Sequence, residues 1–457
     1  MRGSARLRNY LIILLDAAII FLCFFIVLLF GRDNTFQRLL GLRKIIYVTI
    51  ASTVLIFIFT DMYGDIFKKY KEIIFNCTIA GIIGIVLFYI LVQVRVWHSG
   101  TVKISYLLVM LLMIAFLSAE RILVEILYRS VMKVKGIAIV GDINQGRRIG
   151  YEFIKNKEKT HSIKYMFNPS SGLKGFNAII EDTDIVIVCP GIDKDIKDDI
   201  VGMCGSYDKD VLLIPELYEI NTMRPRLTQI DDTPYLYFDT KGLSGEEKVL
   251  KRTFDLVFSI ILAILTFPIM LVCALIIKLE SRGPVLFKQE RVTRDGNFEI
   301  IKLRTMIIDA EKHTGAVLSI ANDSRITKFG KFLRKSRLDE VPQIYNVIKG
   351  DMSLIGPRPE RPVFIEEFSK DYPDYDKRHA VKAGISGLAQ IMGKYSTNAA
   401  DKLRYDLIYI RNYSIMLDIK IFFLTLKTVF LEPGSVLDGV KIDYAAELKK
   451  YDIKIIQ

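Results

Sequence analysis

Two adjacent acids, Asp339 and Glu340, are the residues whose type and setting best suit chemistry in this chain. They lie in the stretch RKSRLDEVP at 334–342, directly after several basic residues. Ser336, three residues before Asp339 and ahead of an apolar run, predicts a helix N-cap. An acid in a first helical turn beside cations is held ionised at neutral pH, where it can act as a nucleophile or a metal ligand. Residue types alone leave a second interpretation open, in which the pair only caps a helix on a basic surface.

The composition indicates a chain in which membrane segments and water-exposed segments alternate. It is 51% hydrophobic and 25% charged, with a formal net charge of +12. This charge suits an anionic lipid surface, nucleic acid or phosphorylated substrates, and composition does not choose among them. Five cysteines without Cys-x-x-Cys spacing and four scattered histidines argue against a disulfide framework, a zinc site and a Ser-His-Asp triad.

The N-terminal part of the chain carries four apolar stretches, at about residues 10–30, 45–59, 73–94 and 104–117. A bilayer core requires about 20 apolar residues per helix, so these stretches predict a four-span helical region over residues 1–133. Basic residues favour the N-terminus, the second loop and the segment after the fourth span as cytoplasmic. We therefore expect the rest of the chain on the cytoplasmic face.

Residues 134–240 alternate short apolar strands with helical patterns, which predicts a Rossmann-like α/β domain. The stretch GIAIVG at 136–141 predicts a buried strand that enters a turn. However, Ile143 stands where a dinucleotide fingerprint needs its middle glycine, and no clear acidic ribose partner follows. The sequence favours a structural, cofactor-free use of this domain.

A fifth hydrophobic stretch, centred on Thr266-Phe267-Pro268, follows the middle domain. Proline removes a backbone donor where lipid offers no replacement. We expect a re-entrant helix-break-helix over residues 254–279, with Pro268 at the membrane break, which keeps the following chain cytoplasmic. A kinked helix that spans the bilayer is the alternative.

Residues 251–430 contain long motifs in a fixed order, namely KRTFD at 251–255, GPVLFKQER at 283–291, KLRTM at 302–306, the Asp339-Glu340 block, GDMSLIGPRP at 350–359 and GISGLAQ at 384–390. With these motifs the chain resembles the bacterial polyprenyl-phosphate hexose-1-phosphate transferases, the large monotopic phosphoglycosyl transferases. The four apolar stretches and the degenerate nucleotide fold are also similar to the large members of that family.

The resemblance implies an α/β membrane-associated catalytic domain over residues 246–457, on the cytoplasmic face of the bacterial plasma membrane. It implies transfer of a hexose-1-phosphate from a UDP-hexose, with glucose or galactose expected, to undecaprenyl phosphate. This reaction would start capsule, exopolysaccharide or O-antigen synthesis. Asp339 is the implied nucleophile, which forms an aspartyl phosphosugar, and Glu340 the implied Mg²⁺ ligand. The implied partners are the UDP-hexose, undecaprenyl phosphate and the lipid bilayer, without nucleic acid; a homo-oligomer stays open.

An anionic nucleophile approaching a diphosphate needs fixed positive charge and Mg²⁺ to offset the repulsion. The candidate substrate-binding residues are Lys302, Arg304, Arg334, Arg358, Gln390 and Lys394. Arg358 lies between two prolines that stiffen its backbone, so its guanidinium can be pre-placed at modest entropic cost. Lys394 stands where the family often has arginine, and an ammonium lacks the planar fork of a guanidinium.

Two other function classes remain open from the sequence. One is a membrane-tethered nucleotide-sugar dehydratase or oxidoreductase that uses the middle domain. The other is a non-catalytic polysaccharide-assembly protein, in which Asp339 and Glu340 merely cap a helix.

Overall fold

The computed structural model describes residues 2–29, 35–64, 70–94, 100–131, 133–157, 160–238, 242–308, 325–393, 397–431 and 443–456. The chain divides into two compact units. The first comprises Met1–Tyr128, Leu243–Tyr395 and Tyr413–Val436, and the second Arg129–Gly242, Ser396–Asn412 and Leu437–Gln457. The second unit therefore takes two segments from the C-terminal third of the chain, in addition to the predicted middle domain.

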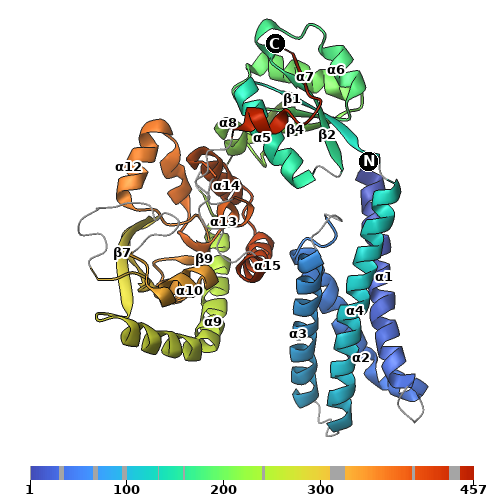
Figure 1. The fold of residues 1–457 in the computed structure, drawn as a ribbon, viewed down its shortest axis with the longest axis vertical. Coiled ribbons are helices and arrows are strands. Elements are labelled where there is room, and N and C mark those ends of the chain that lie inside the picture. The colour runs from blue at the N-terminus through green and yellow to red at the C-terminus, as the bar shows by residue number, and fades with distance from the viewer. Residues whose placement is uncertain are drawn as a thin grey trace. The chain divides into compact units, whose positions relative to one another are not determined.

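The N-terminal helices of the first unit are α1 (Arg2–Leu29), α2 (Thr35–Phe59), α3 (Tyr70–Val94) and α4 (Gly100–Val131) (Figure 1). They share an apolar core to which all four contribute, with Ile20, Phe57, Ile73 and Met110 buried in it. Among the described residues, Leu7–Val27 and Tyr106–Tyr128 are long and apolar enough to cross a membrane, and Ile45–Phe59 is a shorter apolar helix. We call these four helices the membrane bundle.

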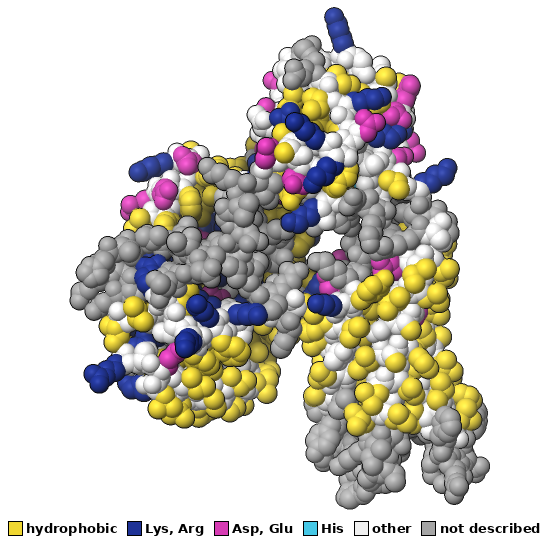
Figure 2. All heavy atoms as spheres, viewed as in Figure 1, with side chains coloured by type: hydrophobic (Ala, Val, Ile, Leu, Met, Phe, Trp, Pro, Cys, Tyr) yellow, Lys and Arg dark blue, Asp and Glu magenta, His cyan; other side chains and the backbone are white. Residues whose placement is uncertain are grey.

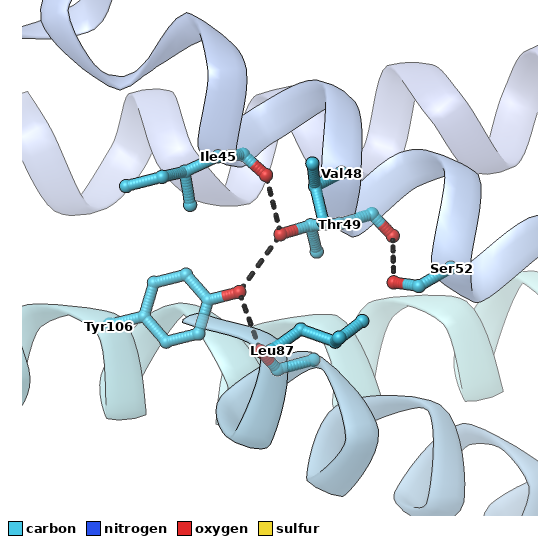
Figure 3. A pocket seen from close by; sticks show the side chains of 7 residues that line it. Ile45, Val48, Thr49, Ser52, Leu87 and Tyr106 are labelled. Atoms are coloured by element: carbon cyan, nitrogen blue, oxygen red, sulfur yellow. Dashed lines mark hydrogen bonds between the residues drawn. The ribbon is translucent and has the colours of Figure 1, made fainter. Parts of the chain in front are cut away.

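The outer surface of the membrane bundle is also apolar, as Figure 2 shows in yellow. Leu14, for example, is 66% exposed. Polar groups instead face inward and pair, as expected where lipid offers no hydrogen bonds. In Figure 3 the Tyr106 hydroxyl of α4 lies 2.9 Å from the Thr49 hydroxyl of α2 and donates to the Gly84 carbonyl oxygen of α3 at 3.3 Å. These bonds tie three helices together.

The second unit is built on a five-stranded parallel sheet of order β11-β2-β1-β3-β4. The strands are β1 (Lys135–Val140), β2 (His161–Phe167), β3 (Ile185–Val188), β4 (Asp210–Leu213) and β11 (Lys454–Ile456). Side chains alternate between faces along a strand. Accordingly, Ile137 and Ile139 enter one core, and Ala138 and Val140 enter the other. The predicted α/β domain with a parallel sheet is confirmed.

The helices of this unit are α5 (Ile143–Lys157), α6 (Phe176–Asp182), α7 (Lys194–Ser206), α8 (Leu217–Asn221), α14 (Ala399–Arg411) and α16 (Tyr444–Leu448). A hairpin of β5 (Arg226–Ile230) and β6 (Thr233–Tyr237) is exposed along its length. Helix α14 packs at the carboxyl edge of the sheet, where Arg404 donates to the carbonyl oxygen of Pro215 at 3.0 Å and Asp401 pairs with Arg148 of α5 at 3.4 Å. The C-terminal strand β11 pairs with β2.

The remainder of the first unit, residues 243–395 and 413–436, is here called the site domain. Its helices are α9 (Gly245–Glu280), α10 (Lys328–Ser336), α11 (Gln343–Lys349), α12 (Pro362–Asp371), α13 (Leu388–Met392) and α15 (Ile415–Leu431), with 3₁₀ turns η2 (Leu338–Glu340) and η3 (Tyr375–Ala380). Its strands form two pairs, antiparallel β7 (Leu286–Thr293) with β8 (Gly296–Leu303), and parallel β9 (Ser353–Ile355) with β10 (Gly384–Ser386).

Helix α9 is the predicted fifth hydrophobic segment. It begins with a capping box of Ser244 and Glu247, and it is long and apolar enough to cross a membrane. The structure assigns one helix that contains Pro268, and its ribbon changes direction along its length in Figure 1. Beyond its first turns most of the helix surface is exposed and apolar, with Ile264 at 69% exposure, whereas Cys273 and Ile277 near its end are buried against the site domain. This surface suits lipid contact.

The first turns of α9 are fastened to the site domain by the charged residues of the KRTFD motif. The Lys251 ammonium is buried, pairs with Asp418 of α15 at 2.7 Å and donates to the Ile355 carbonyl oxygen at 2.9 Å. Asp255 accepts hydrogen bonds from the Ser353 hydroxyl and the Leu354 amide, each at 3.0 Å. The motif therefore anchors the membrane helix to strand β9, which leads into the site.

Candidate active site

Asp339 and Glu340 lie in the turn η2 between helices α10 and α11. Arg337 ends α10 in the left-handed conformation, with φ 55° and ψ 17°. The predicted N-cap at Ser336 is wrong, because Ser336 is the last residue of α10 and its hydroxyl donates to the Phe332 carbonyl oxygen at 2.8 Å. The left-handed residue reverses the chain, so the two acids are presented by a tight turn between two helices.

Glu340 is held by two cations from distant parts of the site domain. Lys302 of β8 lies 2.8 Å and Arg358, which follows β9, lies 2.9 Å from the same oxygen, Oε1. Burial alone would raise the pKa of Glu340, but the charges of Arg358 and Lys302 hold it well below its usual range. Glu340 in turn raises the pKa of Arg358. Glu340 is therefore ionised throughout the physiological range.

Asp339 has the opposite character. Burial, with a further contribution from the charge of Glu340, raises the pKa of Asp339 to about 6, although Lys302, Arg334 and Arg358 oppose the shift. Arg334 of α10 is oriented by its Nε, which donates to the Thr305 hydroxyl at 2.8 Å. Adjacent acids whose pKa values are driven apart suit different roles. Asp339 is mostly ionised at neutral pH, yet more basic than an ordinary aspartate, as a nucleophile should be.

Of the predicted substrate-binding cations, Lys302, Arg334 and Arg358 lie at the acid pair. Arg304 instead contacts backbone carbonyls. The Arg304 guanidinium donates to the carbonyl oxygens of Ser281 and Arg282 at 2.8 and 2.6 Å, so it holds the end of α9. Gln390 donates through Nε2 to the Ile385 carbonyl oxygen at 3.0 Å. Lys394 lies outside the described residues.

The donor set around Glu340 fits a magnesium ion. Both cations bind Oε1, and the described residues give Oε2 no hydrogen-bond partner. Mg²⁺ is usually bound by one or two carboxylates together with substrate phosphates. Asp339 and Glu340 provide carboxylates in a single turn. Within the described residues, no group of three or more His, Cys, Asp or Glu side chains could hold a metal ion by itself. A metal at this site would therefore depend on the phosphates of a substrate.

Three residues near the pair were not found from the sequence. Gln343, the first residue of α11, is only 2% exposed, and its Nε2 has no hydrogen-bond partner among the described residues. Gln343 follows Glu340 by three residues, a spacing that places two side chains on the same face of a helical turn, and this spacing could have indicated it. Arg378 is buried and Arg291 is partly buried, and both donate to carbonyl oxygens of the segment that carries Arg358. Arg291 ends the motif at 283–291, but nothing in the sequence indicates its contact with this segment or distinguishes Arg378 from the other arginines.

Helix α5 of the middle domain contains a tyrosine–lysine pair at the spacing of a dehydratase or oxidoreductase, Tyr151 and Lys155. The Tyr151 ring packs against the Tyr444 ring of the C-terminal segment at 5.5 Å, with the Lys155 ammonium 5.8 Å from its centre. A Cβ added at Gly141, where φ is 147°, would lie 2.5 Å from the Cβ of Cys189. The glycine turn thus serves close packing against β3, and the tyrosine serves packing against α16.

Comparison with known proteins places the similarity over the site domain and α14. Residues 246–432 match the family described as bacterial sugar transferase. The chain is 46% identical over 190 residues to the UDP-N-acetylgalactosamine-undecaprenyl-phosphate N-acetylgalactosaminephosphotransferase of Aeromonas hydrophila, covering 41% of this chain and 45% of that protein. It is 40% identical over 231 residues to the UDP-glucose:undecaprenyl-phosphate glucose-1-phosphate transferase of Klebsiella pneumoniae, covering 49% of this chain and 50% of that protein.

A shorter relative is covered more completely. A Bacillus subtilis protein, provisionally named an undecaprenyl-phosphate N-acetylgalactosaminyl 1-phosphate transferase, is 48% identical over 130 residues, which are 28% of this chain and 72% of that protein. The matched region spans about half the length of the two longer relatives. The similarity includes the acid pair, Lys302 and Arg358, all of which lie within residues 246–432.

Proposed function

The chain belongs to the bacterial sugar transferase family, and from this premise we propose that it transfers a sugar-1-phosphate from a UDP-sugar to undecaprenyl phosphate. The products are UMP and a lipid-linked diphosphosugar, with which synthesis of a capsule, exopolysaccharide or O-antigen would begin. The names of the relatives supply both substrates. One observation carries the proposal: two cations bind Glu340 and leave Asp339, in the same turn, as the more basic acid.

In the first step, Asp339 attacks the β-phosphorus of the UDP-sugar. The bond between that phosphorus and the bridging oxygen breaks, UMP leaves, and the sugar phosphate stays on the carboxylate as an acyl phosphate. Lys302, Arg334 and Arg358 surround the carboxylate with fixed positive charge, which lowers the repulsion between two anions and stabilises charge on the transferring group. These cations also orient the diphosphate before the attack.

Glu340, whose Oε2 has no hydrogen-bond partner among the described residues, would hold a magnesium ion together with substrate phosphates. When bound, it would neutralise phosphate charge and orient the diphosphate. The chain's own contribution is to keep Glu340 ionised at every relevant pH through Lys302 and Arg358. A protonated glutamic acid would be a poor ligand for a hard cation.

In the second step, an oxygen of undecaprenyl phosphate attacks the phosphorus of the acyl phosphate. The bond to the Asp339 carboxylate breaks, and the free carboxylate is restored. This acceptor is confined to the bilayer, whereas a UDP-sugar is soluble in water, so the site must lie at the interface. The exposed apolar surface of α9, which begins in the site domain, supports such a position.

The topology belongs to the same proposal. The chain is membrane-associated, and we place four spans in the membrane bundle, with α9 re-entering at Pro268 and the site domain on the cytoplasmic face of the plasma membrane. UDP-sugars are cytoplasmic metabolites, so this face is the one on which the donor is available. A fully spanning α9 would place the nucleophile on the opposite side from its donor.

The decisive experiment separates the adduct from overall turnover. Purified protein in nanodiscs is incubated with Mg²⁺ and a UDP-sugar that carries a radiolabel on its β-phosphate, without lipid acceptor. UDP-glucose, UDP-galactose and UDP-N-acetylgalactosamine are compared. We expect label on the peptide that contains Asp339, and its release as labelled lipid when undecaprenyl phosphate is added.

Asp339→Asn should lose both the adduct and the lipid product. Asp371→Asn, which changes an exposed acid at the end of α12, is the matched control and should keep both. A turnover-competent protein that never carries label on Asp339, or an Asp339→Asn variant that still labels lipid, would refute the proposal.

A further inference from the structure

We propose that Arg378 is a positioning residue, which directs Arg358 toward Glu340 and the donor diphosphate by holding the backbone that carries Arg358. This inference rests on the proposed function. Arg378 lies on the 3₁₀ turn η3 and is 3% exposed. One nitrogen of its guanidinium donates to the carbonyl oxygen of Arg358 at 3.0 Å, and the other donates to the Tyr375 hydroxyl at 2.7 Å.

The segment that carries Arg358 is held at every carbonyl from 357 to 360. The Gly384 amide donates to Pro357 at 2.9 Å, and the Val292 amide donates to Glu360 at 3.1 Å. Between these two backbone contacts, Arg378 binds the carbonyl of Arg358 and Arg291 binds that of Pro359 at 3.2 Å. The two middle carbonyls are thus held by guanidinium groups, of which that of Arg378 is buried and that of Arg291 partly buried.

The prolines explain why the segment needs outside donors. Pro357 and Pro359 have no amide hydrogen, so the segment cannot form the ladder of an ordinary strand at these positions. Each proline fixes its own φ, and Pro359 restricts the ψ of Arg358 to extended values, but neither proline fixes the φ of Arg358. Hydrogen bonds to the carbonyls at 358 and 359 supply that constraint, because they set the orientation of the peptide planes on the C-terminal side of each residue.

The side chain of Arg358 cannot be positioned by packing alone. It is 45% exposed, and its contact with Glu340 is 2.9 Å. A half-exposed arginine has many rotamers, and its position depends on where its Cα and Cβ are held. The rigid carbonyls therefore determine which rotamers reach Glu340.

The use of two arginines to hold this segment is hard to explain by stability alone, because placing positive charges close together lowers the stability of the fold. Burial, and the neighbouring charges of Arg358 and Arg361, lower the pKa of Arg291 to about 10, while Glu360 opposes the shift. Burying a cation is costly, and like charges nearby add to the cost. Neutral hydrogen-bond donors could hold the two carbonyls with a smaller loss of folding free energy. Arrangements that lower stability in this way are typical of functional sites.

A double-mutant cycle tests whether Arg378 acts through Arg358. Arg378→Gln and Tyr375→Phe are each made in the wild-type chain and in Arg358→Gln. Tyr375→Phe keeps the ring, which lies 5.0 Å from the Arg378 guanidinium, and removes only the hydroxyl that holds it. Lys377→Gln, an exposed neighbour on the same turn, is the matched control. The first half-reaction is followed as UMP release from UDP-glucose in nanodiscs, with the thermal unfolding midpoint measured in parallel.

We expect Arg378→Gln to lower turnover by about 10- to 100-fold in the wild-type chain, since a displacement of about 1 Å in a positioning group has effects of that size. In the Arg358→Gln background it should lower turnover by less than about twofold, because the group that it positions is gone. Tyr375→Phe should show the same pattern with a smaller loss, and Lys377→Gln should change neither. Where Arg358→Gln is too slow to measure, the UDP-glucose-induced rise in unfolding midpoint replaces turnover.

Equal losses in both backgrounds would overturn the proposal, as would full activity of Arg378→Gln. If Arg378→Gln does not fold, the Tyr375→Phe cycle decides by the same criterion. Failure of the proposed function looks different, because the wild-type chain would then release no UMP and form no adduct from any UDP-sugar in the panel. The two failures are therefore distinguishable in a single set of measurements.

Discussion

The acid limb of the pH-rate profile should report the ionisation of Asp339. Burial and the charge of Glu340 raise the pKa of Asp339 to about 6, from an ordinary value of 3.8. If the ionised form is the nucleophile, about nine-tenths of the enzyme is active at pH 7 and about one-tenth at pH 5. The rate of UMP release should therefore fall about tenfold between these two pH values. An aspartate with an unshifted pKa would lose less than about a tenth of its activity over the same range.

Two substitutions should move this limb in opposite directions. Lys302→Met removes a charge that favours ionised Asp339, so the limb should move to higher pH. Glu340→Gln removes the charge that opposes ionisation, so the limb should move to lower pH even though the plateau rate falls. Because Lys302 retains some solvent exposure, we expect shifts at the low end of the usual range, about one pH unit each.

The assay must isolate the first half-reaction. A lipid monophosphate has its own ionisation near pH 6, whereas both phosphates of a UDP-sugar are esterified and have none there. UMP release is therefore followed in a single turnover by rapid quench, at saturating Mg²⁺ and without lipid acceptor. Lys288→Met, on the exposed face of the same hairpin, is the matched control and should leave the limb in place. A wild-type limb near pH 4, or shifts of the same sign in Lys302→Met and Glu340→Gln, would refute the reasoning.

Three further predictions concern stability and topology. Arg304→Gln should lower the unfolding free energy by about 1–3 kcal/mol, because carbonyls at the end of α9 lose their donors, while turnover per folded molecule changes little. Asp418→Asn should lower the unfolding free energy, measured by thermal unfolding, by about 3–5 kcal/mol, because it leaves the buried ammonium of Lys251 without its carboxylate. The exposed control Asp371→Asn should leave the unfolding free energy almost unchanged. Lys288→Cys should react with a membrane-impermeant maleimide in inverted vesicles and not in right-side-out cells; the five native cysteines are buried, and labelling from outside would contradict a cytoplasmic site domain.

The centre of the middle-domain sheet was readable from the sequence because strands β1 and β3 are buried on both faces. Residues 136–141 form an unbroken small and apolar run, and β1 is found at Lys135–Val140. Strand β11 could not be anticipated, since three residues near the C-terminus pair with β2 far away in sequence. Strand pairing over such a distance depends on the path of the whole chain, and a three-residue strand carries too little pattern to identify.

At the site, the sequence indicated the acids but not the partners of each acid. The basic residues next to the pair in the chain suggested its electrostatic setting, yet Glu340 binds cations that lie 38 and 18 residues away. The N-cap prediction failed because Arg337 adopts a left-handed conformation, which is uncommon for residues other than glycine and leaves little trace in residue type. Arg304 has the charge expected of a phosphate ligand, but the fold directs it to backbone carbonyls.

The division of labour between the two acids follows from where the cations lie. Asp339 and Glu340 share one turn and similar burial, and their ordinary pKa values differ little, so neither residue type nor chain position makes one of them the better nucleophile. Lys302 and Arg358 both bind Glu340, which makes it a permanent anion and a weak base. Burial raises the pKa of Asp339, and the fixed negative charge of Glu340 raises it further, so Asp339 is the more basic acid. The reactivity of Asp339 is thus set by its burial and tuned by the charges around it, and a change that moved Lys302 or Arg358 would alter the nucleophile without replacing it.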